Sequence, residues 1–495
     1  MNRLIRMCPV LLLVLVVMSG CGGTKASDIS SIEDMKGKKI GVQIGTTGDI
    51  YVSDYEGDKE GTKIERYNKG NDAISSLKNG KIDCVVIDSE PAKAFVAKNE
   101  DLSILKEPFA LEEYAICISK ENTELKEQIN DALRELKEEG TLDKIISGYI
   151  NGEEYQYTSP EGISYDQGTL VMATNAAFPP YEYYDDNTIV GIDADMARAV
   201  GDKLRRKLEI QDMEFDSIIN AVQGGKADIG AAGMTVTEER LKNIDFSDSY
   251  TTATQVIVVR NGKKNSLMSI KDSFYQSFIE GARYKYILTG LRNTLVISFF
   301  AVLLGVAIGF LVSIIRTTYD KTGKLMIPNY ICKVYLTVIR GTPTMIQLLI
   351  IYYVIFASVN VNKILVAVLA FAINSGAYVA EILRGGIMSL DEGQFEGARS
   401  LGLNHRQTMC YVILPQTIKN TLPALANEFI VLIKETAISG YIGLQDLTMS
   451  GNIIRSNTYQ AFFPLISVAL IYLLLVMVLS AGVTRLERRL KKNER

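Results

Sequence analysis

The sequence has few of the side chains that metal and nucleotide sites need. Its 495 residues contain six cysteines and one histidine, His405, and no two cysteines form a C-x-x-C pair. Zinc and thioredoxin-like sites therefore have no ligand set. The pattern G-x-x-x-x-G-K-[ST] is also absent, so this chain has no P-loop for ATP hydrolysis. We expect no metal, no cofactor and no catalytic residues.

Basic charge is not concentrated on any long segment. The formal net charge is -4, and the only basic block is at the extreme C-terminus, which argues against a nucleic-acid-binding surface. Charged residues are spread through 28–285, whereas long apolar runs with few charges fill the stretch from Leu288 to Val483. The sequence therefore predicts a soluble part followed by a membrane part.

The N-terminal segment, residues 1–21, has the pattern of a signal peptide. Two arginines precede an apolar run that ends at Met18, which is too short for a good membrane span and is followed by small residues and Cys21. The run VMSGCGG resembles a lipoprotein processing site, in which the cysteine is acylated, although Met18 replaces the usual leucine. An uncleaved anchor helix is the alternative. Both place the next domain outside the cytoplasm.

Two soluble segments alternate apolar strands with helical stretches. Residues 28–150 do so through KIGVQIG, IDCVVID and ELKEQINDALRELKEEG, and residues 169–262 through GTLVMATN, GIDADMARAVGDKL and TQVIVVR. Each predicts an α/β lobe around a mainly parallel sheet. Residues 151–168, rich in Gly, Ser, Pro and polar groups, are expected to connect them at the surface. The sequence does not decide whether Cys84 and Cys117 form a disulfide.

These segments resemble the family 3-type amino acid-binding proteins of ABC transporters, which are two-lobed receptors of the Venus flytrap, type II periplasmic-binding-protein-like fold. ATNAAFPPYEY, GIDADMARAVGDKL, GMTVTEERLKNIDFSDSY and QVIVVRNG resemble the family's first lobe. DMKGKKIGVQIGTTGD, LKNGKIDCVVIDSEPAKAF and GTLDKIISGY resemble its second lobe. The second-lobe segment comes first here, which implies a circular permutation. Lobes completed between two chains are the alternative.

The resemblance also implies a site for an amino acid ligand. Arg240 corresponds to the arginine that binds the ligand carboxylate, with help from Thr235 and Thr47, and Asp88 corresponds to the carboxylate that takes the ammonium. The remaining expected site residues are Gly233, whose carbonyl is a second ammonium acceptor, Phe178 and Phe215 as walls, and Asn175.

Each ligand residue also has a plain structural explanation. Arg240 could pair with the acids of its own helix, Asp88 could cap the helix that starts at Ser89, and the aromatic residues could belong to the core. Asn175 stands where the family often carries aspartate, which weakens the case for a cationic ligand. We therefore expect a neutral polar amino acid.

After a linker at 263–285, residues 286–488 are expected to form an all-α membrane domain with about five spans. If the N-terminus is outside, five spans place the basic tail, residues 489–495, in the cytoplasm, as the positive-inside rule requires. The expected spans lie near 287–315, 330–357, 363–383, 424–437 and 462–483.

Between the third and fourth expected spans, at about 392–416, lies the polar segment GQFEGARSLGLNHRQTMCYVILPQ. It resembles the cytoplasmic coupling loop of ABC type I importer permeases (MetI-like), with Glu396, Gly397 and Ala398 for the opening Glu-Ala-Ala pattern and Gly402 for the loop glycine. RGTPTMIQ and YVAEILRGGI are similar to further signatures of the polar amino acid branch, the His/Glu/Gln/Arg-type permeases. The resemblance implies that a separate ABC ATPase docks on this loop.

The sequence thus predicts the substrate-binding and permease subunit of an ABC importer, multi-pass in the cytoplasmic membrane, which captures a polar amino acid outside the cell. About five spans imply a second permease copy, as a homodimer, or a related permease. Acylation of Cys21 would add membrane lipid as a partner. A ligand-sensing membrane receptor without transport is the alternative, but only a short basic tail follows the last expected span. An enzyme is disfavoured, because no acid–base constellation occurs beyond the ligand clamp.

Overall fold

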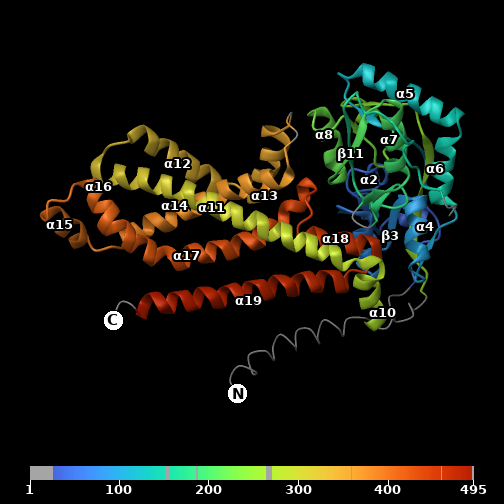
Figure 1. Ribbon diagram of the computed structural model, residues 1–495. Helices are drawn as coiled ribbons and strands as arrows, with labels where there is room; N and C mark the ends of the chain where they lie inside the picture. The colour runs from blue at the N-terminus through green and yellow to red at the C-terminus, as the bar shows by residue number, and fades with distance from the viewer. Residues whose placement is uncertain are drawn as a thin grey trace.

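The computed structural model describes residues 26–151, 155–185, 188–262, 270–357, 359, 361–458 and 460–492. The expected signal peptide and Cys21 lie outside these residues. An α/β part, residues 26–262, lies at one end of an elongated helical part, residues 270–492 (Figure 1).

One α/β lobe, here called lobe 2, is built on a sheet of order β2-β1-β3-β14-β4, with β5 paired to β14. β1 is parallel to β2 and β3, whereas β14 is antiparallel to β3. β3 is buried at every position, as its continuous apolar run predicts for a strand covered on both faces. Its elements are η1 (Glu33–Met35), β1 (Lys39–Gln43), α2 (Thr47–Ser53), β2 (Lys63–Tyr67), α3 (Gly70–Lys78), β3 (Cys84–Asp88), α4 (Ser89–Ala97), β4 (Leu102–Ile104), β5 (Ala110–Tyr114) and β14 (Thr251–Arg260).

The other lobe, lobe 1, has a sheet of order β11-β7-β12-β6-β13 and a small antiparallel sheet, β10-β9-β8. Its elements are β6 (Cys117–Ile118), α5 (Thr123–Glu138), α6 (Thr141–Ile150), β7 (Thr169–Thr174), β8 (Ala177–Phe178), β9 (Glu182–Asp185), β10 (Thr188–Val190), α7 (Ile192–Lys203), β11 (Lys207–Asp212), η2 (Phe215–Ser217), α8 (Ile218–Gln223), β12 (Ile229–Gly230), α9 (Glu238–Leu241) and β13 (Asp245–Phe246).

The lobes exchange segments, so their boundary in space differs from the boundary along the sequence. The chain crosses from lobe 2 to lobe 1 between β5 and β6 and returns between β13 and β14. β6, α5 and α6 therefore belong to lobe 1, although the sequence groups them with 28–150, and β14 belongs to lobe 2. The sequence motifs group residues by their order along the chain, whereas a lobe consists of the strands that pair in one sheet and the helices that pack on it. The two groupings therefore differ. Both lobes are completed within one chain.

The two crossings run side by side. Ser247 N donates to Ile116 O at 2.9 Å, and Tyr250 N donates to Tyr114 O at 3.0 Å. Cys84 and Cys117 lie in different sheets, and both are free, so the structure contains no disulfide between them.

The described part of the connection between α6 and β7 lies against α7. The Tyr157 and Tyr165 hydroxyls both donate to the Asp202 carboxylate, each at 2.9 Å. The surface connection expected at 151–168 is thus tied to lobe 1 by its tyrosines.

The helical part contains α10 (Ile270–Phe274), η3 (Tyr275–Ile279), η4 (Glu280–Ala282), α11 (Tyr284–Thr322), α12 (Met326–Gly341), α13 (Thr344–Ile350), η5 (Ile351–Ile355), α14 (Lys363–Met388), α15 (Glu392–Ser400), α16 (His405–Thr408), η6 (Met409–Ile413), α17 (Leu414–Glu435), η7 (Thr436–Ile442), α18 (Leu447–Thr458) and α19 (Phe462–Lys492). Among the described residues, three helices are long and apolar enough to cross a membrane, namely α11, α14 and α19.

The second expected span is not one straight helix. Its two halves, Met326–Gly341 and Thr344–Ile355, meet at 110° and make a fourth span if they are counted as one. Thr342 is extended (φ -122°, ψ 146°) because it precedes Pro343, and proline disfavours helical geometry at the residue before it. The fourth expected span, 424–437, falls mostly in α17, where Glu428 and Lys434 make the helix more polar than the three spans. The described residues therefore contain three or four of the five expected spans.

Glycines set the close contact between the two longest adjacent helices, α11 and α14. A Cβ atom on Gly309 would lie 2.5 Å from Val379 Cγ1 and 2.8 Å from Ala380 N. A Cβ on Gly305 would lie 3.1 Å from Ser375 Cβ. Small residues at these positions let the two backbones approach, which is how membrane helices gain packing contacts without a hydrophobic driving force.

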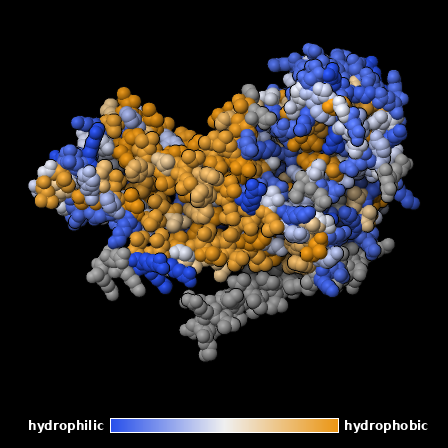
Figure 2. Space-filling view, viewed as in Figure 1, coloured by the Kyte–Doolittle hydropathy of each residue, from blue (hydrophilic) through white to orange (hydrophobic). Residues whose placement is uncertain are grey.

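The α/β part contacts the helical part through both lobes. In lobe 2, Asp72 pairs with Arg455 of α18 at 2.7 Å. In lobe 1, Lys226 Nζ donates to Tyr352 O at 2.9 Å, and Lys363 Nζ of α14 donates to Asp212 O at 3.2 Å. Figure 2 shows hydrophobic surface around the middle of the helical part and hydrophilic surface at both ends, over the α/β part and around α15.

We predict that Gly309→Ala destabilises the helical part, because the added Cβ meets the Val379 side chain and the backbone nitrogen of Ala380, and overpacking typically costs about 1–3 kcal/mol. The matched control is Gly385→Ala in α14, where no atom lies within 4 Å of the added Cβ. There the better helix propensity of alanine should leave stability unchanged or raise it by up to about 1 kcal/mol. Thermal unfolding of the detergent-solubilised chain measures both; equal midpoints would contradict the prediction.

Candidate functional site

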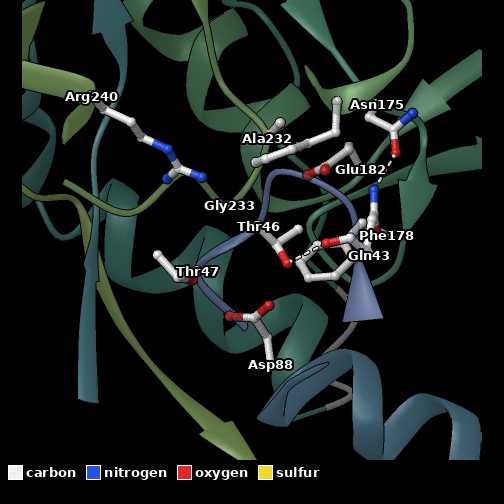
Figure 3. A pocket seen from close by; sticks show the side chains of 11 residues that line it. Gln43, Thr46, Thr47, Asp88, Asn175, Phe178, Glu182, Ala232, Gly233 and Arg240 are labelled. Atoms are coloured by element: carbon white, nitrogen blue, oxygen red, sulfur yellow. Dashed lines mark hydrogen bonds between the residues drawn. The ribbon is translucent and has the colours of Figure 1, made fainter. Parts of the chain in front are cut away.

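A small cavity lies between the two lobes and is lined from both sides (Figure 3). Every ligand residue expected from the sequence lines it except Thr235, whose hydroxyl is 3.5 Å from that of Thr47. Its volume is ≈ 10 Å³, about enough for one water molecule, so a ligand can enter only when the lobes separate. The lining residues are Gln43, Thr46, Thr47 and Asp88 from lobe 2, and Asn175, Phe178, Glu182, Phe215, Ala232, Gly233 and Arg240 from lobe 1.

Arg240 reaches across the cavity from α9. Its guanidinium donates to Thr235 O at 2.6 Å and to Gly45 O of lobe 2 at 2.8 Å, and only 6% of the residue is exposed. The structure shows no ion pair between Arg240 and the acids of α9. Since both acceptors are neutral carbonyls, a buried positive charge faces the cavity and favours an anionic group there.

Asp88 faces Arg240 from the other lobe (Figure 3). It stands at the N-cap of α4, but its side chain makes no capping hydrogen bond. Its Oδ1 instead accepts from the Tyr114 hydroxyl and from Gln255 Nε2, the latter at 2.8 Å. Burial, and then the nearby charge of Glu112, raises the pKa of Asp88 to about 7. Asp88 is thus a buried acceptor in the site, not a helix cap.

Sequence reasoning missed three residues on the crossing strands that support this site. Glu112 Oε2 accepts from the Thr235 hydroxyl at 2.9 Å and from Gln255 Nε2 at 3.1 Å. Gln255 thereby joins Asp88 to Glu112, and Tyr114 holds Asp88 from β5. A signal existed in β5: Glu112 and Tyr114 are two residues apart, so they point to the same face.

A second acidic pair lies at the wall of the cavity. Glu182 lines the cavity, and burial raises its pKa well above the usual range. Asp193, which accepts from Gly233 N at 2.7 Å and from the Tyr250 hydroxyl at 2.8 Å, has a pKa raised to about 6 by burial. Asp193 therefore fixes the backbone turn at Gly233, whose φ is +53°.

Asn175 and Gln43 close one wall of the cavity. Gln43 Nε2 of lobe 2 donates to Asn175 Oδ1 of lobe 1 at 3.3 Å (Figure 3). Asn175 Nδ2 in turn donates to Met213 O at 2.8 Å. Asn175 thus links the lobes across the cavity that it lines.

The segment with Glu396, Gly397, Ala398 and Gly402 forms two short helices, α15 and α16, at the end of the molecule opposite the α/β part (Figure 1). Gly402 adopts a left-handed conformation, with φ +85°, and has open space around it. Glu396 and Gly397 are exposed, Ala398 is buried, and Leu401 is 84% exposed. An exposed leucine at a tight turn between helices suits a surface that a partner covers.

The family model of the bacterial extracellular solute-binding proteins, family 3, matches residues 170–445. The chain belongs to this family.

The chain is also similar to permeases of known transport systems. It is 39% identical over 210 residues to the putative glutamine transport system permease protein GlnP of Rickettsia typhi, covering 42% of this chain and 94% of the relative. It is 37% identical over 208 residues to the glutamine transport system permease protein GlnP of Escherichia coli K12, covering 41% and 93%. This family 3 chain therefore carries a permease as well.

Among solved structures, the chain is similar to that titled "Crystal structure of an amino acid ABC transporter with histidines". The sequence identity is 44% and the TM-score 0.39, and the match covers 43% of this chain and 98% of that chain.

The buried carboxyls predict that the binding domain is more stable in mild acid. The pKa of Asp88 is raised to about 7 and that of Asp193 to about 6, from an ordinary value of 3.8. The folded state therefore binds these protons more tightly than the unfolded chain, and stability rises as the pH falls from about 7 toward 4. We expect a higher unfolding temperature at pH 5.5 than at pH 8 for ligand-free residues 26–262, and a smaller difference for Asp88→Asn. A midpoint that falls on acidification would contradict this.

Proposed function

We propose that this chain is the substrate-binding and permease subunit of an ABC importer that captures a polar amino acid outside the cell. The observation that carries the proposal is the pairing of two sites at opposite ends of one membrane part. At one end a cleft between lobes presents Arg240 opposite Asp88, and at the other end α15 and α16 form an exposed helical turn. ATP hydrolysis belongs to a separate subunit.

The charges of the cleft fit the two ends of a free amino acid. The Arg240 guanidinium takes the carboxylate in place of its present carbonyl acceptor on lobe 2, and ionised Asp88 takes the ammonium, with Gly233 O as a further acceptor. Thr47 and Thr235 supply hydroxyls beside the carboxylate, and Phe178 and Phe215 cover the apolar stem.

Glutamine is the first candidate ligand. The relatives of the helical part carry glutamine transport in their names. The side chains of Asn175 and Gln43, on one wall of the cleft, are neutral amides that can donate and accept hydrogen bonds. A neutral polar side chain can exchange hydrogen bonds with these two amides, which carry no charge that would attract a cationic side chain.

Ligand binding shifts the lobes toward the closed arrangement. Hydrogen bonds cross the cleft from Arg240 to Gly45 O, from Gln43 to Asn175 and between the hydroxyls of Thr47 and Thr235. A ligand that contacts both lobes strengthens the closed state by the difference between its affinities for the closed and open states.

The binding domain faces the outside, and α15, α16 and the C-terminus face the cytoplasm. Two features support this topology. Basic side chains gather at the α15 end, where Lys321 pairs with Glu392, and the end of α19 carries Arg488 and Arg489. The signal-peptide pattern ahead of the binding domain supports export, and acylation of Cys21 would anchor it. Two copies of the permease, as a homodimer, complete the pathway.

The direct test is calorimetric titration of the full chain, in detergent, with the twenty common amino acids. We expect one neutral polar amino acid to bind with micromolar affinity or better. Uptake of that amino acid by proteoliposomes that also contain the ATPase subunit then tests transport. Binding without uptake would favour a sensory receptor, and no binding at all would sink the proposal.

Arg240→Ala should abolish ligand binding, because no other cation lines the cleft of the described chain. We expect a loss of at least about a hundredfold in affinity, or 2.7 kcal/mol, by the conversion of 1.36 kcal/mol for each factor of ten. Arg134→Ala is the matched control, since Arg134 is an exposed arginine of lobe 1 that pairs with Asp131. Circular dichroism checks folding, and micromolar binding by the folded Arg240→Ala chain would remove Arg240 from the site.

Gly402→Asp should leave ligand affinity unchanged but abolish ligand-stimulated ATP hydrolysis by the reconstituted complex. The substitution adds a charged side chain and backbone strain at the turn between α15 and α16. Gly323→Asp is the control, because Gly323 also has a positive φ, +68°, and open surroundings, between α11 and α12. If both variants keep normal stimulation, the docking role of this turn is wrong.

A further inference from the structure

A second cavity, ≈ 280 Å³ in volume, lies between the binding domain and the permease. Both lobes and the permease contribute to its walls. Its volume is much larger than that of the cleft between the lobes, which is ≈ 10 Å³. Its size suits a small polar molecule. The cavity is lined by Asn68, Lys69 and Asp72 of lobe 2, Glu214 of lobe 1, and Ala437, Gly440, Tyr441, Thr448, Met449, Asn452 and Arg455 of the permease.

Two charged side chains in this cavity lack direct partners. Lys69 is only 5% exposed, yet its ammonium makes no hydrogen bond or ion pair with any residue that the structure describes. Glu214 Oε2 is buried and likewise has no hydrogen-bond partner among the described residues. A buried charge without a partner is costly, so a site that keeps two of opposite sign is suited to a ligand that satisfies both.

The two charges come from opposite lobes, and they influence each other through space. Burial raises the pKa of Glu214, while the charge of Lys69 acts to lower it. They are not within ion-pair distance of each other, and the cavity opens between the elements that carry them. A cation and an anion so arranged match the carboxylate and ammonium of a zwitterion.

The cavity lies directly behind the wall of the ligand cleft. Lys69 precedes Gly70, whose N–H donates to Gln43 Oε1 at 3.1 Å, and Gln43 lines the cleft. On the other lobe, Glu214 precedes Phe215, which also lines the cleft. The same two chain segments therefore form one wall of each cavity.

Separation of the lobes would part this wall. Across it, the Gln43–Asn175 hydrogen bond of 3.3 Å joins the two lobes (Figure 3). Because Gln43 moves with lobe 2 and Asn175 with lobe 1, opening breaks this bond and connects the cleft with the space behind it. The ligand would then leave the cleft toward the permease.

The permease side of the cavity is polar and is fixed to lobe 2. Arg455 of α18 pairs with Asp72 at 2.7 Å, and the neighbouring Ser456 accepts from Asn71 Nδ2 at 3.1 Å. Thr448 and Asn452 add polar side chains to the wall. The cavity thus ends on α18, which packs against the membrane helices α11 and α19.

We propose that this cavity is a handover site that holds the zwitterionic amino acid between cleft and permease, with Lys69 binding its carboxylate and Glu214 its ammonium. The inference rests on the proposed function, because it takes its ligand from the cleft. It assigns a second, weaker binding site to the same amino acid.

Lys69→Met and Glu214→Gln test the site in the full chain reconstituted with its ATPase subunit in proteoliposomes. Each variant should keep the calorimetric affinity of the cleft within about threefold and lose at least tenfold in the rate of uptake at saturating ligand. Lys36→Met and Glu33→Gln are the matched controls, because this exposed pair of lobe 2 lines neither cavity. The controls should transport like the wild-type chain.

A direct measurement separates a ligand site from a merely structural role. In Arg240→Ala, which removes binding in the cleft, saturation-transfer NMR with the transported amino acid should still detect weak binding. Adding Lys69→Met should remove that signal, while adding Lys36→Met should not.

The failures of the two proposals differ. If the wild-type chain neither binds nor takes up an amino acid, the proposed function is wrong. If the wild-type chain does both, then normal uptake by Lys69→Met and Glu214→Gln, or an NMR signal that does not depend on Lys69, overturns the handover site alone.

Discussion

The double crossing between the lobes is the constraint on which the rest of this structure depends. Neither soluble segment is complete by itself, because β14 belongs to the sheet of lobe 2 and β6 to that of lobe 1. The crossings also carry Tyr114 and, beyond them, Gln255, which hold Asp88 in the cleft. One pair of strands therefore joins the lobes, lets them move and supports the site between them.

The two ends of the binding domain lie together in lobe 2. Ser27 N donates to Arg260 O at 2.9 Å, so the segment that follows the expected lipid anchor and the strand that precedes the permease are neighbours. The domain is thereby held from one side, and contacts through Asp72 and Lys226 dock both lobes on the permease. As a result, the cleft, the interface cavity and α18 lie one after another in space, from the binding domain toward the membrane helices.

A buried charge that is not paired with an opposite charge marks both proposed ligand positions. Arg240 donates only to carbonyls in the cleft, and Lys69 has no direct partner in the interface cavity. By contrast, the buried carboxylate of Asp193 accepts hydrogen bonds from Gly233 N and from the Tyr250 hydroxyl. Because an unpaired buried charge costs free energy, its persistence at these two places argues for ligand binding rather than for stability.

The sequence by itself determined the two-part architecture and identified the side chains that gather at the cleft. Apolar runs and local motifs carry that information, since they act over short stretches of chain. Only the tertiary structure decided which lobe owns α5, α6 and β14, that Glu112 and Gln255 support Asp88, and that α12 and α13 meet at a bend. It also created the cavity lined by Lys69 and Glu214, which are 145 residues apart and share it only because both lobes and the permease each contribute a wall.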